Sequence, residues 1–83
     1  MGSFVYSQEQ HISTHTGTIH WFSRLKGIGQ IRPDTGGYDI MANISDFVET
    51  QPAGSLEHKM VSYKLAKSEF GGQARQINLV RSV

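Results

Sequence analysis

Short alternations of apolar and polar residues, separated by turn residues, run along most of the chain. Nine glycines and two prolines interrupt the sequence, and turn signals recur at intervals of about ten residues, which is the spacing of an all-β domain. No segment has the apolar i, i+3, i+4 spacing of a convincing amphipathic helix. The pattern predicts one helical turn at 45–48 and five strands, at 16–23, 27–32, 38–44, 60–67 and 73–80.

The alternation also assigns faces to the strands, because successive side chains of a strand point to opposite sides of a sheet. Apolar positions on the inward faces form the predicted core: Ile19, Ile31, Ile40, Ala42, Ile44, Val61, Tyr63, Leu65, Ile77 and Leu79. The outward faces of the second and third strands carry Ile28, Gln30, Arg32, Met41 and Asn43. Five short strands are too few for two packed sheets, but they can close into a small barrel of the OB or SH3-like type.

The length of 83 residues is that of one small domain. No apolar run approaches the roughly 18 residues that span a bilayer, and the polar segment 1–14 lacks the central apolar stretch of a signal peptide. The chain has no cysteine, which excludes disulfides and cysteine-based zinc sites and permits a reducing compartment. We therefore expect a cytoplasmic protein that does not contact a membrane.

Residues 1–14 are predicted to be an N-terminal extension, and residues 15–83 are predicted to form the domain. Within the extension, Phe4, Val5 and Tyr6 strongly favour a β-strand. This segment could add an edge strand to the barrel. It could also pair or swap between two copies of the chain and so make a homodimer.

Charge gives only a weak indication of function. Eight Lys and Arg oppose seven Asp and Glu, for a net charge of +1, and the basic residues are spread along the chain. This balance does not by itself indicate a nucleic-acid binder. His11 and His15 have the i, i+4 spacing of metal ligands on a helix, but residues 13–17 form helices poorly, and a solvated tail is the simpler interpretation. We expect neither a metal nor a cofactor.

The sequence gives little support to catalysis. Asp34, Asp39 and Asp46 flank the third predicted strand, and the nearest two occupy turn positions that favour Asp in any case. His20, Asp39 and Ser23 could be imagined as a triad, but no spacing sets up a nucleophile elbow or an oxyanion hole. We therefore expect no enzymatic activity.

Several blocks of the sequence, in the right order, resemble the bacterial cold-shock proteins. The opening blocks are Gly-Thr-Ile-His-Trp-Phe at 17–22, Lys-Gly-Ile-Gly-Gln-Ile at 26–31 and Pro-Asp at 33–34. Asp-Ile-Met-Ala-Asn-Ile-Ser at 39–45 resembles the second nucleic-acid motif of that family. Shorter matches follow at 56–57, 61–63 and 71–74, so the likeness covers roughly residues 15–80.

The resemblance implies a five-stranded antiparallel OB-fold barrel that binds single-stranded DNA or RNA. In this family, bases stack on aromatic side chains of the second and third strands, and lysines contact phosphates. Four residues stand where the family has matching binding residues: Trp21, Phe22, Lys26 and Gln73. The resemblance further implies a role as an RNA chaperone or as a regulator of gene expression.

The remaining motif positions depart from the family. Ile28 and Gln30 replace the two phenylalanines of the first motif, Met41 and Asn43 replace the Phe-x-His of the second, and Ile44 replaces the aromatic residue after it. We therefore expect weak, salt-dependent binding to a single strand, carried mainly by Trp21. Basic residues that would assist it are Arg24, Lys26, Arg32 and Arg75.

Two alternatives remain open at this stage. Strict alternation would put Trp21 on the same side as Ile19, in the core, and only a bulge or the family likeness lifts it to the surface. The apolar pair Ile28 and Met41 could contact bases, lie under the N-terminal extension, or bind a protein partner or a second copy. In that last case the fold is an interaction or self-association module with little nucleic-acid binding.

Overall fold

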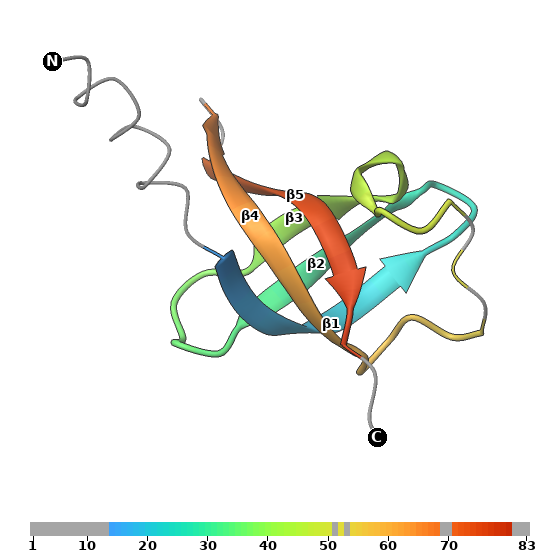
Figure 1. Cartoon of the computed structure of the whole chain (residues 1–83), viewed down its shortest axis with the longest axis horizontal. Coiled ribbons are helices and arrows are strands. Elements are labelled where there is room, and N and C mark those ends of the chain that lie inside the picture. Colours follow the sequence, from blue (N-terminus) through green and yellow to red (C-terminus); the bar gives the residue numbers. More distant parts are fainter. Residues whose placement is uncertain (1–13, 51, 53, 69–70, 81–83) are drawn as a thin grey trace, which may run out of the picture.

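The computed structural model describes residues 14–50, 52, 54–68 and 71–80, and it contains five strands (Figure 1). Their order along the chain is β1 (Thr14–Ser23), β2 (Ile28–Pro33), β3 (Ile40–Asn43), β4 (Met60–Ser68) and β5 (Gly71–Leu79). The 3-10 turn η2 (Ile44–Asp46) follows β3 directly. Residues 1–13, which include the predicted strand at 4–6 and His11, lie outside the described part of the chain.

The strands form a closed barrel in the order β1-β2-β3-β5-β4. In Figure 1 the long strands β4 and β5 cross in front of β2 and β3. The prediction of an all-β, five-stranded OB-type barrel is confirmed. One of the strand pairings is not antiparallel, because β3 and β5 pair in parallel through Met41 and Gln73. The chain passes through β4 between these two strands, so β3 and β5 run in the same direction.

The third strand is shorter than predicted. It spans Ile40–Asn43 rather than 38–44. Gly36 and Gly37 adopt φ values of 90° and 92°, so the preceding turn keeps the backbone before Ile40 out of strand pairing. Tyr38 is consequently 96% exposed. The predicted helical turn appears slightly earlier than expected, as η2, where the Asn43 side chain accepts a hydrogen bond from the backbone N–H of Ser45 (3.0 Å).

The core lies inside the barrel and consists of apolar side chains from all five strands and from the β3–β4 connection. Its buried members are Ile19, Ile31, Ala42, Phe47, Leu56, Val61, Tyr63, Ala74 and Ile77, and Phe22, Ile40, Ile44 and Leu79 pack against them.

The core assignment of Leu65 was wrong, since this side chain is 39% exposed. Leu65 pairs with the buried Ala74 and therefore shares its face. Burial of this face at Ala74 therefore does not extend to its cross-strand neighbour on β4.

Tyr63 is the largest fully buried side chain of the core, and its ring stacks on the His15 ring with 5.7 Å between centroids. Burial raises the pKa of the Tyr63 phenol above its usual value of 10, and the negative charge of Asp34 adds to this effect. Above pH 10 the phenol therefore ionises in the unfolded chain before it ionises in the folded one. Proton loss then favours the unfolded state, and stability falls as the pH rises through the folded pKa.

We expect Tyr63→Phe to remove this alkaline loss of stability. The free energy of unfolding, measured by urea denaturation between pH 8.5 and 11.5, should fall less steeply for the variant than for the wild type. A single group accounts for at most about 1.4 kcal/mol per pH unit. Tyr38→Phe, at an exposed tyrosine, should follow the wild type. Equal slopes for Tyr63→Phe and the wild type would contradict the prediction.

Candidate nucleic-acid interface

A β-bulge at His20 decides which side chains of β1 reach the surface. In the pairing of β1 with β2, Ile19 lies opposite Ile31 and Trp21 lies opposite Gln30, so His20 is the extra residue. A bulge of this kind changes the face that the following residues occupy. As a result Ile19 is fully buried, whereas Trp21 is 37% exposed. Of the two alternatives for Trp21, the structure therefore adopts exposure at the surface rather than burial in the core.

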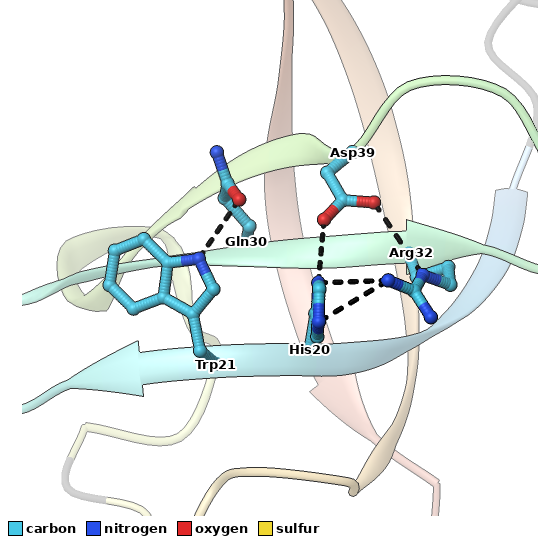
Figure 2. Close-up of polar contacts among 5 residues, drawn as sticks. All are labelled: His20, Trp21, Gln30, Arg32 and Asp39. Carbon is cyan, nitrogen blue, oxygen red and sulfur yellow. Dashed lines mark hydrogen bonds and ion pairs between the residues drawn. The ribbon is translucent and has the colours of Figure 1, made fainter.

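The indole ring of Trp21 is held by Gln30 on the neighbouring strand (Figure 2). Its Nε1–H donates a hydrogen bond of 2.9 Å to Oε1 of Gln30. An indole N–H can only donate, so the bond requires the amide oxygen and turns the amide NH2 of Gln30 away from the ring. The contact fixes the indole orientation on the surface and leaves the Gln30 NH2 as the group available to a ligand.

The barrel register brings four of the predicted site residues into one row across four strands. Trp21 lies opposite Gln30, Gln30 opposite Met41, and Met41 opposite Gln73. Met41 is 49% exposed in the middle of this row. Adjacent strands are about 4.8 Å apart, so the row measures about 14 Å. We call Trp21, Gln30, Met41 and Gln73 the cross-strand row.

Ile28 and Asn43 form the next pair beside the row. Both residues are half-buried. The Asn43 carboxamide oxygen accepts hydrogen bonds from the backbone N–H of Ser45 at 3.0 Å and from its hydroxyl at 2.8 Å. Asn43 therefore serves first as the cap of η2, and its NH2 group is the part left for a ligand.

Arg32 lies at one end of the interface in a cluster with His20 and Asp39 (Figure 2). Its Nη2 atom is 3.1 Å from Nδ1 and 3.2 Å from Nε2 of His20, which places the guanidinium against the imidazole ring. Asp39 lies 2.9 Å from His20 Nδ1, and its other oxygen lies 3.8 Å from Arg32 Nε. The charge of Arg32 is thus already balanced by a carboxylate.

A second arginine–aspartate pair lies at the Gln73 end of the row. Asp46 accepts a hydrogen bond of 3.1 Å from the amide of Gln73, and its second oxygen lies 3.8 Å from Nε of Arg75. Asp46 has no proton to donate when ionised, so the Gln73 amide must point its NH2 toward it. The carbonyl oxygen of Gln73 is the group that remains for a ligand.

The other two predicted basic residues lie in the turn between β1 and β2 rather than in the row. Lys26 is exposed in the turn between β1 and β2, where its backbone N–H donates to the Ser23 hydroxyl at 3.2 Å. Arg24 donates to the carbonyl oxygens of Pro52 and Gly54. This guanidinium therefore ties the β1–β2 turn to the loop before β4.

Phe22 does not lie on the same surface as Trp21. Its ring packs edge-on against Phe47 with 5.7 Å between centroids and an interplanar angle of 85°. It also occupies the space beside Gly29, where an added Cβ would lie 2.4 Å from the Phe22 ring. Phe22 thus contributes to the end of the core rather than to the cross-strand row.

The sequence places Asp39 and Asp46 beside the third strand, but it does not show that each pairs with a cation. It also gives little support to a triad of His20, Asp39 and Ser23. The structure does join His20 to Asp39, but their third partner is Arg32, whereas the Ser23 hydroxyl is engaged in the β1–β2 turn. The one sequence signal for this cluster is the alternation of the second strand, which places Arg32 outward.

Among the residues that the structure describes, no three His, Asp or Glu side chains gather as a metal site. No helix in that part of the chain has the length and apolar character needed to cross a membrane.

Comparison with known proteins gives consistent relatives. No family model matches the chain. The chain is 39% identical over 67 residues to the probable cold shock protein y4cH of Sinorhizobium fredii, covering 77% of this chain and 93% of that protein. It is 34% identical over 65 residues to the cold shock-like protein CspA of Bordetella pertussis, covering 78% and 97%.

A solved structure has the same fold. The chain resembles Drosophila Unr CSD456 with a TM-score of 0.72 and 16% identity, covering 92% of this chain and 30% of that one. At this identity the likeness concerns the fold alone. Sequence identity above 30% over nearly the full length of the bacterial relatives is decisive for kinship, and the chain belongs to the cold shock protein family.

Proposed function

We propose that this chain binds single-stranded RNA or DNA on the cross-strand row and acts as an RNA chaperone or a regulator of gene expression. The observation that carries the proposal is Trp21, which the bulge turns outward and Gln30 holds in place at the start of the row. Bases stack on exposed aromatic side chains regardless of their identity. An oriented indole beside outward amides is suited to capture unstacked bases and so to favour the single-stranded form by mass action.

The surface should bind more weakly than one with a full set of rings. Each base–aromatic stack is worth about 1–3 kcal/mol. Three missing stacks would cost about 3–9 kcal/mol if they added, which corresponds to about a hundredfold to a millionfold in affinity. Met41 and Ile28 recover part of this loss, because they still offer apolar contact to the face of a base.

Phosphate contacts add a modest salt dependence. Exposed ion pairs are worth about 0–1 kcal/mol, so a phosphate can replace Asp39 at Arg32 or Asp46 at Arg75 at little cost. With Lys26 as a third cation, about three phosphates are neutralised. Binding should then weaken with a slope of about −2 in log K against log salt.

A second candidate function is an interaction or self-association module. Met41, half-exposed on the outer face beside Ile28, favours it, since apolar patches of this kind mark protein interfaces. Sedimentation velocity distinguishes the two functions. A monomer at every concentration counts against self-association, whereas a dimer that Met41→Ser dissociates supports it.

Trp21 fluorescence should be quenched when the protein is titrated with oligo-dT or mixed-sequence RNA at low salt, and the quenching should weaken at physiological salt. The signal reports one site, because Trp21 is the only tryptophan. Trp21→Ala should bind a labelled oligonucleotide about 5- to 150-fold more weakly in fluorescence anisotropy. Met60→Ala, at an exposed methionine outside the row, is the control. A flat fluorescence signal at both salts would sink the proposed function.

A ring restored at position 30 should strengthen binding. Gln30→Phe and Gln30→Leu both remove the hydrogen bond to Trp21, but only the first adds a stacking surface. We expect Gln30→Phe to bind oligo-dT about 5- to 150-fold more tightly than Gln30→Leu, as measured by anisotropy. Equal affinities for the two variants would show that bases do not lie over the second strand.

A further inference from the structure

A groove lies next to the cross-strand row, between β4 and β5 on one side and η2 with the residues after it on the other. Its volume is about 500 Å3. Polar and apolar residues share the lining, and those that bear on its function are Asp46, Val48, Lys64, Ala66, Arg75 and Gln76. Of the groove residues, only Arg75 was predicted from the sequence to assist nucleic-acid binding.

The groove holds two facing cations. Lys64 and Arg75 are direct cross-strand partners in the pairing of β4 with β5. Side chains at such positions are separated by about 5 Å at Cβ, and like charges there repel. Asp46 is the carboxylate among the described lining residues, at 3.8 Å from Arg75 Nε, and its other oxygen is held by Gln73. Within this described lining, two cations and one carboxylate leave a net positive charge that a bound phosphate would neutralise.

An apolar side chain of the groove lining remains open to solvent, since Val48 is 60% exposed. A ligand with an apolar face and an anionic group would cover Val48 and neutralise the two cations. A nucleotide has this combination, whereas a simple anion would leave the apolar lining uncovered.

The backbone at Gln76 supports a ligand-facing role for the groove wall. Gln76 has a φ of 50°, in the left-handed region that non-glycine residues avoid, at a register shift between β4 and β5. Its carbonyl accepts a hydrogen bond of 3.3 Å from the Asn78 side chain. Such conformations persist where the surrounding structure holds them, and they cluster at binding sites. The exposed Gln76 amide is available to the edge of a base.

The register makes the groove continuous with the row. Gln73, the last residue of the row, lies opposite Ala66 on β4, and Ala66 lines the groove. One further strand spacing of about 4.8 Å therefore leads from the row into the groove. A single-stranded nucleic acid that crosses Trp21, Gln30 and Met41 therefore reaches Lys64 and Arg75 without leaving the surface.

We propose that this groove is an additional nucleotide subsite for the same single-stranded nucleic acid, with a base against Val48 and a phosphate between Lys64 and Arg75. The inference rests on the proposed function of the row. It implies that an oligonucleotide long enough to extend past Gln73 gains affinity that a short oligonucleotide lacks. Lys64, which no prediction from the sequence included, becomes a phosphate-binding residue.

The test compares dT4 and dT8 binding by the full chain, using calorimetry at low salt. The row accommodates about four nucleotides, near the lower limit for a single OB fold. Lys64→Gln should weaken dT8 binding about fivefold, reduce its salt slope by about 0.7, and leave dT4 binding unchanged. Lys59→Gln removes the same charge at an exposed position outside the groove and should affect both strands equally and slightly.

The outcomes separate the groove from the row. If dT4 quenches Trp21 but Lys64→Gln and Lys59→Gln affect dT8 equally, the groove proposal is overturned and the proposed function stands. If neither strand binds, both fail. Backbone amide NMR shifts at Val48 and Gln76 should appear with dT8 and be absent with dT4. If thymidine monophosphate or a glutamate-rich peptide shifts these signals while dT8 does not, the groove is not a subsite for the single-stranded nucleic acid.

Discussion

The outer surface depends on the change of face at His20. Ile19 must close the core and Trp21 must leave it, yet residues two apart on a regular strand share a face. The bulge resolves this conflict, and Gly29 lets β2 approach it closely. A Cβ on Gly29 would lie 2.4 Å from both the Trp21 carbonyl oxygen and the Phe22 ring. The close packing of β1 against β2 and the exposure of the indole are therefore parts of one arrangement.

Local alternation was sufficient to predict most of the barrel core. Ile19, Ile31, Ala42, Val61 and Ile77 are all fully buried, as period-two patterning predicts. The same pattern failed at Leu65, because alternation assigns a side chain to a face but does not say how far along the strand that face is covered. The bulge could not be derived from alternation either, since it is a property of the register between two strands.

The polar side of the interface was the least predictable part. Arg32 on β2 pairs with Asp39, just before β3, and Arg75 on β5 pairs with Asp46 in η2. Each pair combines residues that the sequence presents as separate surface charges. The near balance of charges in the composition is consistent with such pairing, but it does not say which partners meet. Only the barrel closure through β3 and β5 brings the η2 carboxylate beside Gln73 and Arg75.

Amides in place of rings change what such a surface selects. A ring accepts the face of any base, whereas an amide held in one orientation offers a single polarity. Trp21 leaves the NH2 of Gln30 outward, and Asp46 leaves the carbonyl oxygen of Gln73 outward. A base that buries either group without a matching partner loses a hydrogen bond to water, at a cost of about 1–3 kcal/mol. If the row binds a strand as proposed, it gains less from every base than a ring platform does, and it discriminates more by hydrogen-bond pattern.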